Sequence, residues 1–211
     1  MVALLRLENV WKMLGGRWVL RGVTLALGPG EAVVVSGANG SGKTTLLRLS
    51  AGLAEPSRGR VGWGCPRGPR GCVGYVGHTP MVYGDLTVWE NVEFFSSLHG
   101  GSLGDYPLAA EAWRLLGLEK YRTHLASQLS FGWRRRLDVV RALLGEPRLL
   151  LLDEAFTGLD QGASEALSRL LRLALGEGLA LLMTTPLLEP RYLGLASRVY
   201  TLQDGLLAEA S

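Results

Sequence analysis

Glycine, lysine and hydroxyl side chains gather in the stretch GANGSGKT, directly after the apolar run EAVVV. The stretch fits the spacing GxxxxGK[ST], with a strand pattern before it and a helical pattern after it. Glycines in this context let successive backbone N–H groups point at phosphate oxygens. Lys43 would contact the β- and γ-phosphates of a nucleoside triphosphate, and the Thr44 hydroxyl would help to hold Mg²⁺. An ordinary glycine-rich turn is the alternative. The candidate phosphate-binding residues are Gly37, Ala38, Asn39, Gly40, Ser41, Gly42, Lys43, Thr44 and Thr45.

Two adjacent carboxylates, Asp153 and Glu154, follow the apolar run from Leu149 to Leu152. Such a run predicts a buried parallel strand, and ligands of open α/β sheets collect where these strands end. We expect Asp153 to bind Mg²⁺ together with Thr44. We expect Glu154 to be the catalytic base that polarises a water for in-line attack on the γ-phosphate. The alternative is a pair of carboxylates that only cap a strand.

A third stretch, LSFGWRRRL from Leu129 to Leu137, lies shortly before the acidic pair. It predicts a glycine turn that opens onto a helix. Phe131 and Trp133 are bulky where such a turn would rather have small or polar residues. One interpretation is a nucleotide-sensing loop, and the other is a helix N-cap with an aromatic packing pair.

The elements around these stretches predict an α/β fold. LLRLENV, VLRGVTLAL and EAVVVSG indicate an antiparallel β flap that leads into a buried strand, and the apolar spacing after it indicates a helix that begins near Lys43. A helical insert occupies approximately residues 87–145, with Pro107 near a helix start. Strands and helices then alternate up to a hairpin at Asp204-Gly205. The prediction is one domain over residues 1–211, built on a mostly parallel sheet.

Composition limits the classes of function. A 47% hydrophobic content over 211 residues predicts a globular chain, and a net charge of only +3 is small for a dedicated nucleic-acid binder. No apolar run reaches the ~18 residues of a membrane span, and MVALLRLENV lacks the apolar core of a secretion signal. These features predict a cytosolic protein. Cys65 and Cys72 could form a disulfide, but we expect them to be reduced and structural.

The three stretches, in this order and at about this spacing, resemble the nucleotide-binding subunit of an ABC transporter over essentially the whole chain. The resemblance implies a P-loop NTPase fold of ABC type with ATP and Mg²⁺ as cofactors. In that family ATP is sandwiched between two subunits, so Ser130 and the backbone around Gly132 would meet the γ-phosphate held by a partner subunit. Asp160 matches an aspartate that contacts the other subunit.

Several positions depart from the family pattern on the binding side. Phe131 and Trp133 replace a glycine and usually a glutamine. The family's adenine-stacking aromatic falls near Leu14, so either Trp11 or Trp18 would have to replace it, unless both belong to the core.

Further departures concern hydrolysis. The γ-phosphate-sensing glutamine of the family falls at His78 or Thr79, and Pro186 stands where family members have a switch histidine. Proline offers neither an imidazole nor an N–H group. The resemblance therefore implies a subunit that binds ATP but hydrolyses it slowly.

The segments GYVGHTP and DLTVWENVEFF resemble those of the ATPase subunit of the haem exporter used in cytochrome c maturation. The partners implied are integral membrane transporter subunits and a second ABC subunit, identical or not, at the inner face of the membrane. A partner helix would dock on Met81, Val82, Tyr83 and Trp89, unless these form the core of the insert. The alternatives are a non-catalytic subunit of a heterodimer and a soluble ABC protein acting on nucleic acid. We do not expect nucleic acid as a partner.

Overall fold

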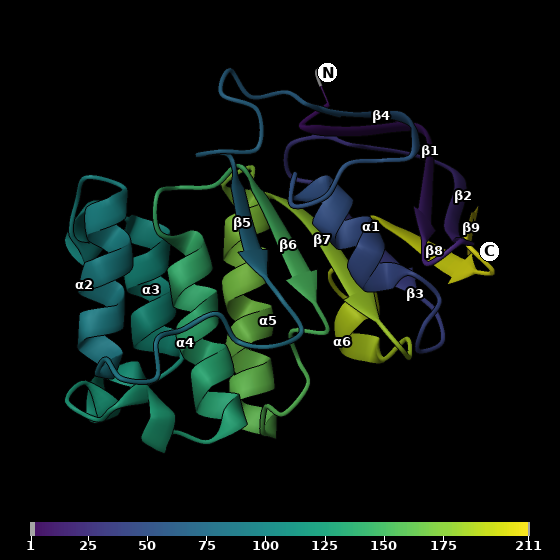
Figure 1. Cartoon of the computed structure of the whole chain (residues 1–211). Helices are drawn as coiled ribbons and strands as arrows, with labels where there is room; N and C mark the ends of the chain where they lie inside the picture. The colour runs from purple at the N-terminus through teal and green to yellow at the C-terminus, as the bar shows by residue number, and fades with distance from the viewer. Residues whose placement is uncertain (1–2, 211) are drawn as a thin grey trace.

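The computed structural model describes residues 3–210, which form two β-sheets with helices around the larger one (Figure 1). The smaller sheet is antiparallel and has the order β2-β1-β4. The larger sheet has the order β5-β6-β7-β3-β8-β9. The strands are β1 (Leu5–Leu14), β2 (Arg17–Leu27), β3 (Ala32–Ser36), β4 (Arg58–Trp63), β5 (Val73–Val76), β6 (Leu149–Asp153), β7 (Ala180–Thr185), β8 (Arg198–Gln203) and β9 (Leu206–Glu209).

The larger sheet is parallel from β5 to β8, and only the closing hairpin of β8 with β9 is antiparallel. Every residue of β3, β6 and β7 is buried, because helices or the smaller sheet cover both faces. Successive residues of β3 pack into different clusters: Val34 joins one, and Val33 and Val35 join the other. The mostly parallel sheet with an antiparallel flap is therefore confirmed.

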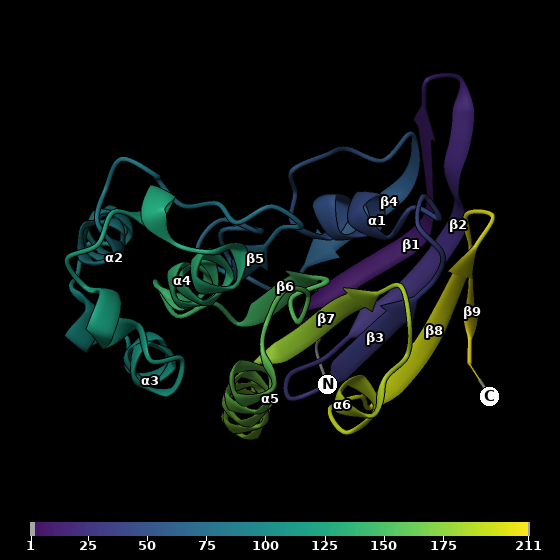
Figure 2. The ribbon, with the colours of Figure 1, turned by 90° about the horizontal axis from the view of Figure 1, so that it is seen from below.

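Helices lie on both faces of this sheet (Figure 2). On one face α1 (Lys43–Ser50) packs between the sheet and the flap, with Leu46, Leu47 and Leu49 fully buried. On the other face lie α5 (Gln161–Gly176) and the short α6 (Pro190–Leu193). The hydrophobic side of α5 packs in the cluster that contains Val34, through Leu167, Leu170, Leu171 and Ala174.

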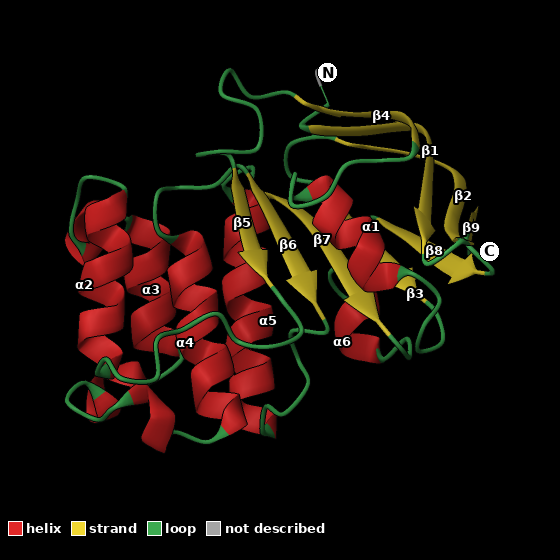
Figure 3. Cartoon of the chain, in the orientation of Figure 1, coloured by secondary structure: helices red, strands yellow, loops and turns green. Residues whose placement is uncertain are grey.

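The helical insert stands beside the sheet and carries no strand of it (Figure 3). It contains α2 (Val88–Leu98), α3 (Pro107–Leu115) and α4 (Phe131–Leu143), joined by 3₁₀ turns at Leu103–Asp105, Leu118–Tyr121 and Ala126–Gln128. Thr87 caps α2 through a reciprocal pair of hydrogen bonds with Glu90, and Pro107 is the first residue of α3. The predicted insert is confirmed.

Several local features differ from expectation. The sequence patterns did not predict β4, β5 or α6, because RGRVGW is largely exposed and glycine-rich and the other two span only four residues each. Cys65 and Cys72, expected to be reduced, form a disulfide across the glycine- and proline-rich connection between β4 and β5. Across residues 3–210, the helices are all too short or too polar to cross a membrane.

Candidate functional site

The loop from β3 to α1 has the shape that its glycines allow. A side chain at position 37 would place its Cβ 2.4 Å from the carbonyl oxygen of Leu202. Gly42 has φ 108°, and a Cβ there would lie 2.9 Å from the carbonyl oxygen of Val19. No side chain caps the N-terminus of α1, and the Ser41 hydroxyl is buried without a hydrogen-bond partner among the described residues. A buried donor and an uncapped helix N-terminus fit a phosphate group.

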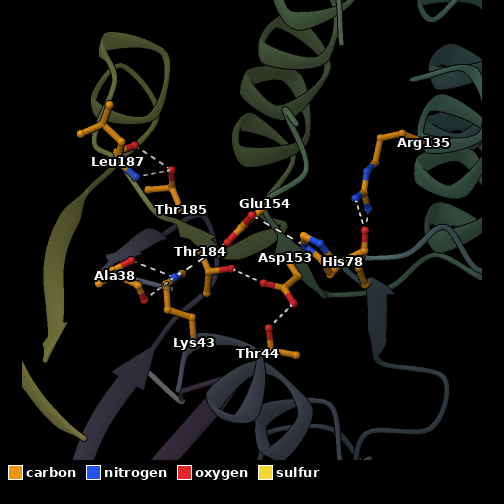
Figure 4. Close-up of polar contacts among 12 residues, drawn as sticks. Ala38, Lys43, Thr44, His78, Arg135, Asp153, Glu154, Thr184, Thr185 and Leu187 are labelled. Carbon is orange, nitrogen blue, oxygen red and sulfur yellow. Dashed lines mark hydrogen bonds and ion pairs between the residues drawn. The ribbon is translucent and has the colours of Figure 1, made fainter. Parts of the chain in front are cut away.

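Lys43 begins α1 and is only 4% exposed. Its ammonium donates hydrogen bonds to the carbonyl oxygens of Gly37 (2.8 Å) and Ala38 (3.1 Å) and lies 3.8 Å from Oε1 of Glu154 (Figure 4). The charge is thus held at the mouth of the loop, on the side of the acidic pair.

Asp153, at the end of β6, is a buried acceptor for two hydroxyl groups. Thr44 Oγ1 donates to Oδ2 at 2.7 Å, and Thr184 Oγ1 donates to Oδ1 at 2.6 Å (Figure 4). Thr44 and Asp153, the two residues expected to bind Mg²⁺, are thus in direct contact. Thr184, on the neighbouring strand β7, was not predicted, although the ending MTT of that strand placed hydroxyls at the right edge of the sheet.

Glu154 follows β6 in a left-handed backbone conformation with φ 52°, which is unusual for a residue with a side chain. Its side chain is 15% exposed and lies between the Lys43 ammonium and the His78 imidazole. Oε1 faces Lys43, and Oε2 lies 3.7 Å from Nδ1 of His78. His78 follows β5, so three segments that are distant in sequence meet at this carboxylate.

Two hollows border the loop. One, of about 650 Å³, lies between the loop, the start of β2 and the β8–β9 hairpin, and Trp18 lines it. The other, of about 300 Å³, is lined by Lys43, Thr44, Thr45, His78 and Glu154, among others. Leu14 lines neither, and the Trp11 indole N–H donates to Asn9. Of Trp11 and Trp18, the two tryptophans considered for stacking on adenine, only Trp18 borders the loop.

Ser130 and Gly132 lie at the start of α4, and neither lines the two hollows. Ser130 is the N-cap of α4, with its Oγ 3.4 Å from the backbone N of Trp133. A Cβ at position 132 would lie 2.4 Å from the carbonyl oxygen of Gly158, so this glycine allows a close contact with the segment before α5. Within one chain these two residues therefore make structural contacts, and their expected contact with nucleotide stays a prediction.

The bulky residues of this stretch pack against cations. The Trp133 ring lies 4.5 Å from the Tyr121 ring and packs against the Lys120 ammonium at 4.6 Å and the Arg136 guanidinium at 3.8 Å. Phe131 lies over Gly158 and 5.1 Å from the guanidinium of Arg135. The interpretation as a helix N-cap with aromatic packing thus describes the contacts within the chain.

Asp160 caps α5 by accepting a hydrogen bond from the backbone N–H of Ala163 at 2.8 Å. It also accepts from Arg136 on α4 at 2.5 Å. The hydrogen bond from Ala163, together with the charges of Arg136 and Lys120, lowers the pKa of this exposed carboxyl.

The segment after β5 is held by a buried cation that the sequence analysis did not identify. Arg135 of α4 is fully buried, and its guanidinium donates to the carbonyl oxygens of Gly77 and His78. Its pKa is lowered by burial. At the end of β7, Thr185 Oγ1 is bonded to the backbone of Leu187, and Pro186 is exposed.

The nucleotide loop, the acidic pair and the parallel sheet together define a P-loop nucleoside triphosphatase. The family model described as "ABC transporter" matches residues 20–157, more than half of the chain. The chain belongs to the ABC transporter family and is an ATP-binding, ATP-hydrolysing subunit. Among the described residues, no group of three or more histidine, cysteine, aspartate or glutamate side chains could hold a metal by itself.

Relatives with curated names include transport subunits of two kinds. The cytochrome c biogenesis ATP-binding export protein CcmA of Xanthomonas axonopodis pv. citri is 41% identical over 160 residues, which cover 74% of each chain. The Fe(3+) ions import ATP-binding protein FbpC 2 of Rhodococcus jostii is 33% identical over 97% of this chain and 61% of its own.

Two solved structures agree with the fold over almost the whole chain. An ATP-binding subunit of an ABC transporter superposes with a TM-score of 0.89 at 29% identity, over 99% of this chain and 90% of the other. A dimeric ATP-binding cassette in a post-hydrolysis state, bound to ADP and Pi, has a TM-score of 0.84 at 26% identity, over 97% and 98%.

Proposed function

We propose that this protein is the Mg²⁺-dependent ATPase subunit of a membrane export complex in cytochrome c biogenesis. The observation that carries the proposal is the 41% identity to CcmA over three quarters of each chain. The resemblance of GYVGHTP…DLTVWENVEFF to haem-exporter subunits supports haem as the cargo.

Residues 37–45 bind the phosphates of ATP. The backbone N–H groups of the loop and the uncapped start of α1 face the anion, and the Ser41 hydroxyl gains a partner. Lys43 moves its ammonium from the carbonyl oxygens of Gly37 and Ala38 to the β- and γ-phosphates. Trp18, at the border of the larger hollow, provides the aromatic face for adenine.

Thr44 and Asp153 would hold Mg²⁺. Their side chains already meet at 2.7 Å, and a hydroxyl with a carboxylate is a ligand pair suited to a small hard cation. When bound, Mg²⁺ neutralises charge on the β- and γ-phosphates. Because the protein offers few ligands of its own, the phosphate oxygens and water must complete the shell. Thr184 keeps Asp153 oriented through its hydrogen bond to Oδ1.

Glu154 acts as the base that accepts a proton from the attacking water. It lines the same hollow as Lys43 and Thr44, and its left-handed backbone conformation is of the kind found at functional sites. Ser130 and Gly132 complete the site of a second subunit, at the N-terminus of α4, where a helix dipole favours an anion. Turnover by this subunit is slow, because Pro186 supplies no imidazole and the start of α4 carries two bulky residues.

The membrane partner docks where the insert meets the sheet. Leu53, Met81 and Arg141 line a groove of about 210 Å³ there, and Met81, Tyr83, Phe94 and Leu98 expose apolar surface nearby. Val82 and Trp89 pack against the core instead. A hydrophobic helix of an integral membrane subunit would cover this surface. The protein is thus cytoplasmic and peripheral at the inner face of the membrane, as one of two ABC subunits.

The test is complementation of a bacterium that lacks CcmA, with haem staining of its c-type cytochromes. The wild-type chain should restore staining and the Lys43→Ala variant should not. A matched strain that lacks FbpC, assayed for iron uptake, is the comparison. If iron uptake but not haem staining is restored, the importer function suggested by the relative with 97% coverage replaces this proposal.

A further inference from the structure

The Glu154 carboxylate lies between two nitrogen-bearing side chains, the Lys43 ammonium and the His78 imidazole. One carboxylate oxygen lies 3.8 Å from the Lys43 ammonium, and the other lies 3.7 Å from Nδ1 of His78. Lys43 is the cation that the phosphates of ATP would attract. If Lys43 were the only polar side chain beside Glu154, the carboxylate would be drawn to the same ammonium that the γ-phosphate needs. His78 offers Glu154 a second anchor on the side away from Lys43.

His78 is suited to this task because its backbone is fixed while its side chain is free. The imidazole is 62% exposed and borders the hollow that Lys43, Thr44 and Glu154 share. Its carbonyl oxygen accepts a hydrogen bond from Nη2 of Arg135 at 2.5 Å, and the same guanidinium binds the carbonyl oxygen of Gly77 (Figure 4).

Burial of the Arg135 guanidinium costs free energy, because it removes a charged group from water. Its guanidinium forms no ion pair among the described residues, its Nε has no partner, and its two hydrogen-bond acceptors are neutral carbonyl groups. Such a cation costs free energy unless the structure around it is well organised. Phe131 lies beside it on the preceding helical turn. Arg135 and Phe131 thus connect the start of α4 to the segment that carries His78.

The other histidines cannot serve Glu154. His99 packs against Tyr106, and His124 packs against Tyr121, both within the helical insert. The end of β7 offers Pro186 and a threonine that is already bonded to Leu187.

We propose that His78 is a positioning residue for ATP hydrolysis: its imidazole orients the Glu154 carboxylate, and Arg135 fixes the backbone from which it does so. The inference rests on the proposed role of Glu154 as the base. It gives this subunit a histidine at the reaction centre that comes from β5 rather than from β7.

The first experiment separates binding from turnover in the full complex with its membrane subunits. His78→Ala should lower kcat about 10-fold, as expected when a catalytic group loses its orientation, while KM and the affinity for Mg-ATP stay within about twofold. His78→Gln should recover much of the rate, because its amide N–H can donate to the carboxylate. His124→Ala, which changes an exposed histidine of the insert, is the matched control and should leave kcat unchanged.

A folded His78→Ala protein with wild-type kcat would overturn the inference, and so would an equal loss of rate in His78→Gln and His78→Ala. Glu154→Gln distinguishes the two levels of the argument. If Glu154→Gln turns over ATP normally, the proposed base is wrong. If Glu154→Gln is inactive and His78→Ala is not impaired, only the role of His78 fails.

The second experiment addresses Arg135. The shorter amide of Arg135→Gln cannot donate to both carbonyl groups as the guanidinium does, so kcat should fall while ATP affinity is kept. Because both changes act through one carboxylate, the double variant with His78→Ala should be no slower than His78→Ala alone. Additive losses would show that Arg135 acts independently of His78. If Arg135→Gln fails to fold, as shown by circular dichroism, the His78 variants still decide the question.

Discussion

Lys43 lies almost fully buried with its ammonium on two loop carbonyl groups, so its loss removes the fixed positive charge of the loop without opening the core. Lys43→Ala should weaken Mg-ATP binding about 100-fold or more, because the variant loses a charge-assisted contact to the phosphates in a protected site. Calorimetry measures the affinity, and Lys120→Ala in the insert serves as a control. Unchanged affinity would contradict the assignment of the phosphate loop.

Gly132 is a position where the fold leaves no room for a side chain. In Gly132→Ala the new Cβ would meet the carbonyl oxygen of Gly158 at 2.4 Å, so we expect a loss of about 1–3 kcal/mol in the free energy of unfolding. Gly176→Ala is the matched control, because no atom lies within 4 Å of a Cβ there and its φ is not positive. That control should be neutral or slightly stabilising in urea denaturation. Equal effects of the two changes would contradict the packing argument.

For single residues, the sequence was sufficient to predict candidates that lie together in short contiguous motifs. GANGSGKT and the pair Asp153-Glu154 needed only local spacing to be recognised. Thr184 and Arg135 could not be found in this way, because their partners are Asp153 on the adjacent strand and the backbone of residues 77 and 78. Their roles depend on which strands become neighbours, and no local pattern contains that information.

The ends of β6 and β7 set the geometry for a stronger test of His78. Asp153 is opposite Thr184 in the register, so Pro186 lies one position past the residue opposite Glu154. If the end of β7 can present an imidazole to the same centre, Pro186→His should raise the turnover of His78→Ala by about 10-fold. ATPase rates of the single and double variants in the full complex measure this. Because proline also limits the local turn, melting temperatures must accompany the rates. A folded double variant that is as slow as His78→Ala would show that β7 cannot supply the group.

The start of α5 predicts a dependence on pH. The pKa of Asp160 is lowered by its hydrogen bond from Ala163 and by Arg136, so the charged form stabilises the folded state. That stability is fully present above the ordinary pKa of about 3.9 and is lost as the pH falls through the lowered folded value. Asp160→Asn keeps an acceptor but not the charge. The gap in urea midpoint between the wild type and Asp160→Asn should therefore be present at pH 7 and shrink below about pH 4. A gap that stays constant over this range would contradict the electrostatic argument.

Element by element, the buried runs were the most predictable. LLLLD and LALLMT allow few alternatives to a central strand, and α2 carries its own capping signal in Thr87 and Glu90. The exposed strand β4 and the four-residue β5 lack such patterns, and pairing with their neighbours forms them.

For the whole molecule, the distance of Ser130 and Gly132 from the hollows beside the phosphate loop, together with their proposed role in the site of a second subunit, predicts a dimer that depends on ATP. Glu154→Gln keeps the shape of the site but removes the base, so ATP should be trapped and a sandwich dimer should accumulate. Light scattering coupled to chromatography, with and without Mg-ATP, measures the mass. Adding Lys43→Ala to the same protein should abolish the dimer. A protein that binds ATP and stays monomeric would indicate that the start of α4 is inactive in this role or that the natural partner is a different chain.

The strand order also has a consequence for how the protein is made. Strand β3, which carries the phosphate loop, lies between β7 and β8, and the residues after β8 form one wall of the larger hollow. At about 5–20 residues per second, a ribosome completes β3 many seconds before either neighbour exists. During that interval the nascent chain contains the whole GANGSGKT sequence but has no sheet on which to hold it. The strand that carries the phosphate loop can therefore be held between β7 and β8 only after both of these later strands have been synthesised.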